Sequence, residues 1–465
     1  AERPASRGPL RASVGALRRA TGPGGDWPRT RRVVPWVVAL FVAMLFLVPF
    51  DAVVLPVNLG VDSKIDRALI LALALAVVVA WLGGGRTAPR LRRSPTDFAL
   101  LAFGSVVVLS LALNLPDLSH AGQIGLALRR VALLASYAVF FYVVASCVRP
   151  SEVPHLVTLI IAASVLTALG TIVEYRSHVN VFYETSRALI PGATVTPVPV
   201  APDLARANVV GPAGHGLADA TLLTIALPFA VLRFVERAGW RRLLYGTAVV
   251  LVVAGGIATV RRTALIAMAL ALLVVVLYRG REVWRYLPLL LVALAGVSVL
   301  APDALSGIVD QLRNVQSDSS AGDRMSDYPA VMPDIASHLV AGRGFGSLDI
   351  RNYRILDNQL LGTLIETGVL GLVAFLWVVA SPLLTAHRVA RAGGPLSGAA
   401  VAIIAASAGF LATNLLYDAF GFRQAIYGFF LIAGLAVVVA RGHDEERVAA
   451  DGTIVVPGST ARGST

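Results

Sequence analysis

Two adjacent arginines, Arg261 and Arg262, stand where one long apolar run of the sequence ends and the next begins. More arginines gather in two polar stretches, at 174–214 and 302–359. Guanidinium groups keep their charge and bind phosphate oxygens through paired hydrogen bonds, so several around one cavity suit a diphosphate. The alternative is that Arg261 and Arg262 only extend to lipid headgroups at the end of their helix. The two stretches contain Arg176, Arg187, Arg206, Arg313, Arg324, Arg343, Arg351 and Arg354.

The composition indicates what kind of fold must position these arginines. Of 465 residues, 56% are hydrophobic and only 15% are charged, whereas soluble domains have about 45–50% apolar and about 25% charged residues. No soluble interior can hold so much apolar sequence, so lipid must be the solvent for most of the chain. The 40 basic residues outnumber the 28 acidic ones, and Cys147, the single cysteine, cannot form an internal disulfide.

Runs of about 20 mainly apolar residues are long enough to cross a bilayer as helices. Twelve such runs occur, so we expect an all-α polytopic membrane protein with about twelve transmembrane helices. The first run contains two prolines and is the least regular. The runs cover 33–50, 67–84, 97–113, 128–148, 153–173, 215–232, 241–258, 263–279, 284–301, 360–385, 396–417 and 422–440.

The arginines at the ends of these runs predict the orientation. Eight arginines precede the first run, and every second short connection after it is also basic, as at 233–242 and 279–285. Positive residues stay on the cytoplasmic side of a membrane, and tryptophans such as Trp240 and Trp284 mark its interface there. We therefore expect both termini in the cytoplasm, and Arg261, Arg262 and the two long loops outside it.

Three parts follow from this topology. We expect residues 1–32 to be a disordered basic cytoplasmic arm on anionic lipid, 33–440 to be the transmembrane domain, and 441–465 to be a disordered cytoplasmic tail. A nucleic-acid-binding arm is the alternative, but no base-reading pattern accompanies the charges, so no nucleic acid partner is expected. Apolar residues at helical spacing in 303–316 predict a short interfacial amphipathic helix within the large outer loop.

The sequence DNQLLGTLIETGVLG, at 357–371, resembles the signature of the O-antigen ligase and O-antigen polymerase superfamily. In that signature a His-Asn or Asp-Asn pair opens a helix that carries Glu-x-Gly-x-x-Gly. Similarly, ATVRRTALIAM at 258–268 resembles the family's Ser-Arg-Ser/Thr element, with Arg262 at the position of the family's arginine and Arg261 where serine is usual.

Two further segments resemble the same family. Residues 206–230 match its segment with arginine, glycine and then histidine before a helix with a late proline. Residues 322–346 match the part before the signature, with an arginine followed by a Gly-x-Gly-x-Gly-like run, where glycine allows tight turns and close backbone approach. The resemblance covers about 206–385 in detail.

The resemblance implies a GT-C-like membrane glycosyltransferase in the bacterial cytoplasmic (inner) membrane. Such an enzyme takes a glycan from a polyprenyl-diphosphate carrier at the outer face and attaches it to a hydroxyl of a glycan or glycolipid acceptor. It inverts the anomeric centre without a metal or other cofactor. Carried over to this chain, Arg206, Arg262 and Arg324 would hold the diphosphate, and we expect Arg261 and Arg343 to add to that site.

The proton acceptor is less determined. Asp357 occupies the position of the family's base, which is often histidine in the ligases, so ligation and polymerisation both stay open. A carboxylate is a weak base, but carboxylates serve inverting glycosidases, where proton removal is late. Asp357 could instead be only a cap for the helix that begins near Asn358.

His215, between two glycines at the start of a helix, is the rival base or a structural residue. We expect Glu366 to be buried and paired, orienting arginines rather than reacting.

Other functions are less well supported by the residues. No carboxylate pair stands at metal-ligand spacing and the histidines are scattered, so no metal site is predicted. A transporter or flippase of a lipid-linked or anionic precursor would place charges near the midplane of repeated, interrupted helices. No repeat is evident here and the charges gather outside. A non-catalytic scaffold is a third possibility, against which the density of external arginines argues.

Overall fold

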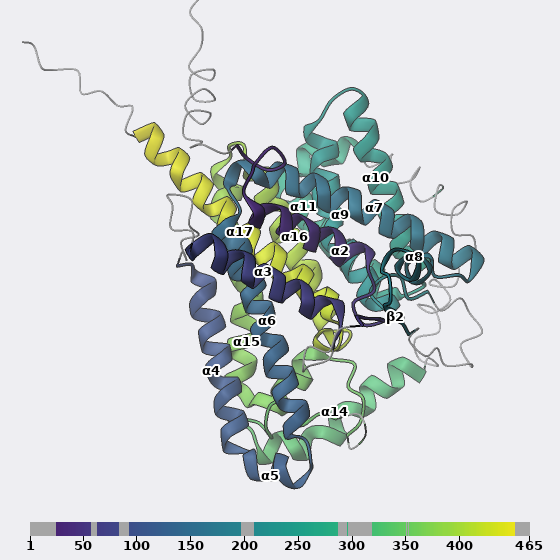
Figure 1. Cartoon of the computed structure of the whole chain (residues 1–465), viewed down its shortest axis with the longest axis vertical. Helices are drawn as coiled ribbons and strands as arrows, with labels where there is room; N and C mark the ends of the chain where they lie inside the picture. The colour runs from purple at the N-terminus through teal and green to yellow at the C-terminus, as the bar shows by residue number, and fades with distance from the viewer. Residues whose placement is uncertain are drawn as a thin grey trace, which may run out of the picture.

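The computed structural model describes residues 25–56, 63–82, 93–196, 209–286, 319–349 and 353–451, together with Ala295 and Arg351. For residues 319–325, 450 and 451, this description includes the backbone but not the side chains. Within these ranges the chain is all-α apart from one two-stranded ribbon, as predicted (Figure 1). The elements are α2 (Val33–Leu47), β1 (Val53–Val54), α3 (Ile65–Leu82), α4 (Pro95–Leu113), α5 (Leu115–His120), α6 (Ile124–Cys147), η1 (Pro150–Glu152), α7 (Val153–Ser177), α8 (Val181–Leu189), β2 (Thr194–Val195), α9 (Gly216–Glu236), α10 (Trp240–Ala258), α11 (Arg262–Val283), η2 (Trp284–Tyr286), α14 (Ser319–Ser337), α15 (Gln359–Ala392), α16 (Ser397–Asn414), η4 (Ala419–Gly421) and α17 (Arg423–Asp451).

The apolar runs of the sequence correspond closely to these helices. Among the described residues, ten helices are long and apolar enough to cross a membrane, and α2 is a shorter apolar helix. The prediction of an all-α polytopic membrane protein is therefore confirmed. The ninth predicted run, 284–301, begins with the short helix η2 and, apart from Ala295, otherwise lies outside the described residues. Most of the basic arm, the segment 303–316 and the end of the tail also lie outside them.

The first predicted run ends earlier than its apolar composition suggested. Helix α2 stops at Leu47, and Val48 already has an extended backbone with φ −114° and ψ 129°. Pro49 follows directly, and a proline disfavours the helical conformation of the residue before it. The proline therefore shortens the helix that hydropathy alone extended to Phe50.

Three helices form the centre of the bundle. In α9, α16 and α17, 89% of the most apolar stretch is buried, against 22% in α3 and 28% in α4. Helix α10 packs on α7 and α9, α11 and α15 pack on α16, and α6 packs on α17. Glycines allow some of these approaches, because a Cβ atom on Gly434 would lie 2.7 Å from the side chain of Val144. Small residues at such contacts are typical of helix packing in lipid.

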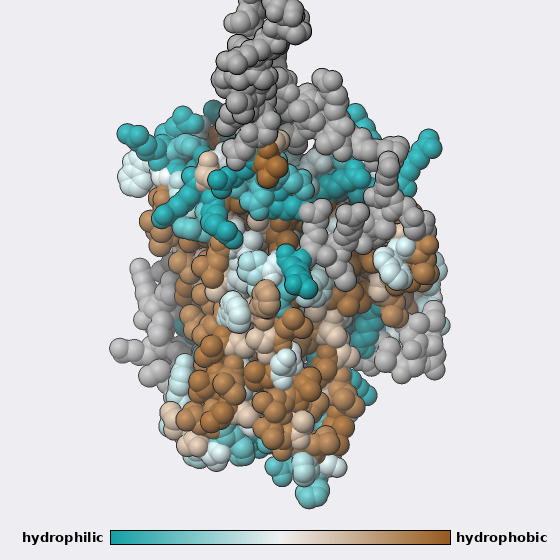
Figure 2. Space-filling view, turned by 90° about the vertical axis from the view of Figure 1, so that its left-hand side faces the viewer, coloured by the Kyte–Doolittle hydropathy of each residue, from teal (hydrophilic) through white to brown (hydrophobic). Residues whose placement is uncertain are grey.

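The outer helices present apolar side chains to their surroundings. Leu75, Trp81, Phe98 and Leu101 on α3 and α4 are all more than half exposed. Figure 2 shows apolar residues over much of the face formed by these helices, with hydrophilic residues gathered at its top and lower tip. A surface of this kind suits a hydrocarbon solvent, since an exposed apolar area this large is rare on soluble monomers.

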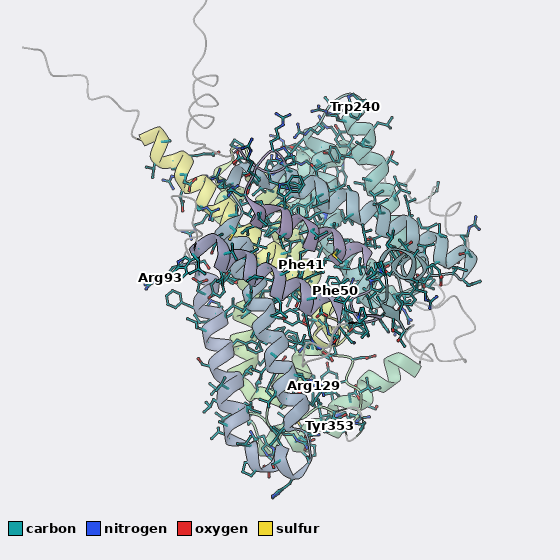
Figure 3. The ribbon with its side chains drawn as sticks, in the orientation of Figure 1. Phe41, Phe50, Arg93, Arg129, Trp240 and Tyr353 are labelled. Carbon is teal, nitrogen blue, oxygen red and sulfur yellow. The ribbon has the colours of Figure 1, made fainter. Side chains whose placement is uncertain are left out.

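Two faces of the bundle can be distinguished by the helix termini that meet there. We call the first the N-terminal face; it contains buried Glu152, which accepts hydrogen bonds from the amide of Trp27 and the guanidinium of Arg32. We call the second the loop face; it contains the β1–β2 pairing, Val53 with Val195. In Figure 3, Trp240 marks one end of the molecule, and Arg129 and Tyr353 lie toward the other. In each of these contacts, the two segments are ones that the sequence analysis placed on the same side of the membrane. The assignment of the N-terminal face to the cytoplasm stays a prediction.

Candidate active site

The start of α15 is capped by Asn358. Its Oδ1 accepts hydrogen bonds from the amides of Leu360 (2.9 Å) and Leu361 (3.1 Å), and its Nδ2 donates to the hydroxyl of Tyr328 at 3.2 Å. The alternative in which Asp357 is merely the helix cap is therefore wrong. Asp357 lies half-buried just before the cap, and its carboxylate belongs to a different set of contacts.

Arg261 and Asp357 meet on the loop face although they are far apart in the sequence. Arg261 is the residue before α11, and the turn that presents it contains Val260 with φ +52°, an uncommon conformation for a β-branched residue. Burial lowers the pKa of the Arg261 guanidinium, and the charge of Asp357 raises it. An arginine stays protonated under such shifts, so a cation lies within electrostatic reach of the Asp357 side chain.

His215 stands beside the same arginine, at the start of α9. Its Nδ1 accepts a hydrogen bond from the amide of Leu217 at 3.2 Å and so caps the helix. Its ring lies 4.7 Å from that of Phe422, at an interplanar angle of 35°. Burial lowers the pKa of His215 to about 4, and the charge of Arg261 lowers it further. The capping bond assigns the imidazole proton to Nε2, so His215 is a hydrogen-bond donor and a poor base.

A second carboxylate, Asp418, joins this group from the loop between α16 and α17. Burial raises its pKa, the charge of Arg130 lowers it, and the charge of Asp357 raises it. Gln359 fixes the loop against α15. Its backbone amide donates to the carbonyl of Tyr417, and its side-chain Oε1 accepts from the backbone amide of Phe420. Sequence reasoning missed Asp418; the available signal was a single acid between two apolar runs.

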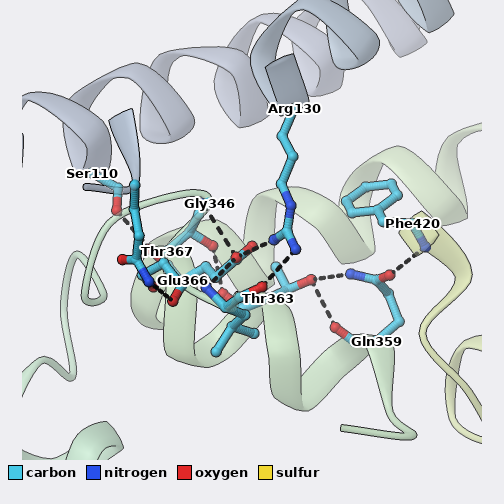
Figure 4. A network of polar contacts seen from close by, with 11 residues as sticks. Ser110, Arg130, Gly346, Gln359, Thr363, Glu366, Thr367 and Phe420 are labelled. Atoms are coloured by element: carbon cyan, nitrogen blue, oxygen red, sulfur yellow. Dashed lines mark hydrogen bonds and ion pairs between the residues drawn. The ribbon is translucent and has the colours of Figure 1, made fainter. Parts of the chain in front are cut away.

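Glu366 is buried and paired, as predicted, but its partner is Arg130 of α6 (Figure 4). Nη1 of Arg130 lies 2.5 Å from Oε1 of Glu366, and its Nη2 donates to the carbonyl of Leu348 at 2.7 Å. The amides of Gly346 and Leu348 both donate to Glu366, each at 3.2 Å. Together these bonds join α6, α15 and the loop after α14 that contains Gly342, Gly344 and Gly346, here called the glycine loop. Sequence reasoning missed Arg130 because it lies within a predicted apolar run.

The glycines of this region allow two stretches of backbone to touch. Helix α15 is broken at Gly368, which has φ +67°. A Cβ atom on Gly368 would collide with the carbonyl of Val340, and one on Gly342 with the carbonyl of Glu366. In return, the amide of Val369 donates to the carbonyl of Leu339 at 2.8 Å. The expectation that glycine serves close backbone approach here is confirmed.

The remaining predicted arginines are placed differently. Nη1 of Arg343 donates to Oδ2 of Asp334 at 2.8 Å, and its guanidinium lies 5.0 Å from the ring centre of Tyr353. The hydroxyl of Tyr353 donates to the same carboxylate at 2.7 Å, and its pKa is raised to about 12 by burial and by Asp334. These contacts hold α14 against the loop that follows it. Arg262 is the first residue of α11.

Two predicted residues cannot be placed from the described side chains. Arg206 lies outside the described residues, and for Arg324 the backbone of α14 is described but not the side chain. Within the described ranges, no three histidine, cysteine, aspartate or glutamate residues gather as metal ligands would.

The molecule is thus a polytopic helical membrane protein with a charged cluster, Arg261, Asp357, His215 and Asp418, at one end of its bundle. The model of the O-antigen ligase family matches residues 247–376, a range that includes the first two of these, the glycine loop and Glu366. This match supports the resemblance to the O-antigen ligase and polymerase superfamily that the sequence motifs indicated. No curated protein matches the chain. The family match and the apolar helices together support a bacterial inner-membrane protein with a role in glycan transfer during polysaccharide synthesis.

Proposed function

We propose that this chain is an inverting, metal-independent glycosyltransferase. It moves a glycan from a polyprenyl-diphosphate carrier to a hydroxyl of a glycan or glycolipid acceptor at the outer face of the inner membrane. The observation that carries this proposal is the half-buried Arg261 beside Asp357, with His215 and Asp418 within electrostatic reach. A cation and a carboxylate that share one site can serve the leaving group and the acceptor of the same reaction.

The cation acts on the leaving group. When the bond between the sugar and the diphosphate breaks, negative charge develops on the diphosphate oxygens. Preorganised donors aimed at that charge are usually the largest contribution to catalysis, and a guanidinium can supply two parallel hydrogen bonds. We assign this role to Arg261 and Arg262, with Arg206 and Arg324 joining them by their sequence positions. Arg343, bound to Asp334 and Tyr353, instead holds the loop.

The carboxylate acts on the acceptor. Asp357 takes the proton of the attacking hydroxyl, late in a transition state that resembles an oxocarbenium ion. Asp418 places a second acidic group within electrostatic reach of Asp357. His215 donates a hydrogen bond from Nε2 to a substrate oxygen rather than removing a proton. Glu366 positions the glycine loop through its bonds to Gly346, Leu348 and Arg130.

A transporter or flippase remains the second candidate because α15 is interrupted, as helices at transport sites often are. At this break, however, backbone groups of the glycine loop bond to the freed groups of α15, with Leu339 accepting from Val369 and Val340 from Leu370. The break is therefore filled by the chain itself. The residues of the charged cluster lie at helix starts and in the loop before α17 rather than inside a helix, which favours transfer over transport.

Purified protein in lipid nanodiscs, given polyprenyl-diphosphate oligosaccharides and candidate acceptors, tests the proposal. We expect acceptor-dependent release of polyprenyl diphosphate that is unchanged by a chelator and depends on Arg261. Arg241, an exposed arginine that packs over Trp240 on the N-terminal face, is the matched control, and Arg241→Ala should leave the rate unchanged. Movement of the intact lipid-linked glycan across the membrane without carrier release would favour the transporter.

A further inference from the structure

A buried carboxyl group on α9 takes no part in the cluster just described. Asp219 is fully buried one turn into the helix, where its amide donates to the carbonyl of His215. Its Oδ2 lies 2.8 Å from Oγ1 of Thr171 on α7, whereas its Oδ1 has no hydrogen-bond partner among the described residues. A carboxylate with one bare oxygen in such a place carries a large desolvation cost.

A second buried carboxyl group, Glu174, faces it from α7. The two oxygens of Glu174 accept hydrogen bonds from the amides of Val210 (3.1 Å) and Gly211 (3.0 Å). Gly211, with φ +60°, lies against the carboxyl group of Asp219, and a Cβ atom there would be 2.6 Å from its oxygens. The two acidic groups lie within range of an electrostatic interaction with each other. Glu174 has the donors that a carboxylate needs, and Asp219 does not.

The contacts of Thr171 indicate where a proton can reside. Its single hydroxyl oxygen lies 2.8 Å both from the carbonyl of Thr167 and from Oδ2 of Asp219. A carbonyl can only accept, and a hydroxyl has one hydrogen to give. If the hydroxyl donates to Thr167, the second contact is a hydrogen bond only when Asp219 carries the proton. The N-terminal position on α9 favours a charge, but a neighbouring buried carboxylate opposes it.

We infer that Asp219 is held as a neutral carboxylic acid that donates to Thr171 and, together with Glu174, positions the turn 209–214. This turn leads directly to His215. It is fastened by both amide bonds to Glu174 and by Nδ2 of Asn180, which donates to the carbonyl of Gly211 at 3.0 Å. Asp219 and Glu174 are positioning residues, and the part of the inference that concerns transfer rests on the proposed function.

Infrared spectroscopy tests the protonation state without any assay of activity. The difference spectrum between wild type and Asp219→Asn, recorded in detergent at neutral pH, should contain the carbonyl band of a protonated carboxyl group that is missing from the variant. A spectrum with only carboxylate bands would overturn the neutral acid. This experiment reports the protonation state of Asp219 even if the protein transfers no glycan. In that case the proposed function fails, but the inference about Asp219 is still tested.

Transfer kinetics test the positioning role. Asparagine can donate to Thr171 as the acid does, so Asp219→Asn should keep kcat/KM for the lipid-linked donor within about threefold. Asp219→Ala removes the carboxyl group against which Gly211 packs and should lower kcat/KM about tenfold or more, mainly through KM, because small displacements of binding groups are costly. Thr224→Val is the control and should match wild type, because this hydroxyl on the same helix donates to the carbonyl of Ala220. If Asp219→Asn is as impaired as Asp219→Ala, or if Asp219→Ala is fully active, the role is refuted.

Discussion

On the N-terminal face, Arg441 donates to the carbonyls of Ala145 and Val148, and Arg32 binds buried Glu152. On the loop face, Arg261 meets the half-buried carboxylate of Asp357 beside a histidine and a second acid. The first set closes the ends of helices, since α6 leaves its last carbonyls without helical partners. The second set places groups of both signs beside each other at the starts of α9, α11 and α15, where Arg261 and Asp357 do not serve as side-chain caps. One residue type thus fastens the fold at one end and forms a candidate reaction site at the other.

The largest expected effect separates these two uses of arginine. Arg261→Ala should lower the rate of carrier release by about 10²-fold or more, because removing one preorganised donor from an oxyanion site typically costs about 10²–10³ in kcat. Arg441→Ala should leave the rate per folded molecule unchanged and lower the thermal unfolding midpoint. Initial rates and unfolding curves on the same preparations measure both, and equal losses of activity in the two variants would contradict the distinction.

Asp357→Asn should slow transfer by about 10²-fold or more without destabilising the protein, since general bases typically contribute about 10²–10⁴. The helix keeps its cap because Asn358 provides it. Steady-state rates with saturating donor and acceptor measure the effect. His215→Asn is the comparison, because asparagine also caps helices and should leave most of the activity. A larger loss with His215→Asn than with Asp357→Asn would make the histidine the base.

Arg130→Ala should destabilise the fold by about 2 kcal/mol or more, because Glu366 would remain as a buried carboxylate without its cation. The arginine itself is about a third exposed, which places the effect below that of a fully buried pair. Arg129→Ala, the exposed neighbour on the same helix, should change stability by less than about 0.5 kcal/mol. Unfolding midpoints in mixed micelles compare the two, and matching midpoints would refute the role of the pair.

Asn358→Ala removes two hydrogen bonds at the start of α15 and should cost about 1 kcal/mol of stability. Asn358→Asp should restore it, because aspartate caps equally well. Carrier release per folded molecule should stay within about threefold of wild type in both variants. An unchanged unfolding midpoint in Asn358→Ala would show that the cap contributes nothing to the fold.

The fold could be predicted from the sequence because lipid imposes one requirement, about 20 apolar residues per span, that hydropathy reads directly. The end of α2 was misjudged because one backbone restriction at Pro49 outweighs the apolar residues around it. The pairing of helices in space, such as α9 with α16, depends on which small residues face each other. No run of apolar residues reveals that.

Part of the site was predicted for a similar reason. Arg261 stands out as one of two adjacent arginines between apolar runs, and His215 as a histidine between glycines at a helix start. Asp357 and Glu366 were predicted from the resemblance of 357–371 to the family signature. Arg130 was missed because it lies within a predicted apolar run, and Asp418 because it is a single acid between two such runs. Only the packed bundle brings Arg130 to Glu366 and Asp418 close to Asp357. Asp357 and Asn358 are equally good caps by type, and the extended backbone of Asn358, with φ −156°, decides between them.

Binding of radiolabelled polyprenyl diphosphate to the protein in nanodiscs tests the role of the loop-face cluster most directly, because it needs neither glycan nor acceptor. Wild type and Arg441→Ala should bind the ligand saturably with the same affinity, and Arg261→Ala should bind it at least about tenfold more weakly. The same affinity in all three proteins would contradict a diphosphate site at Arg261.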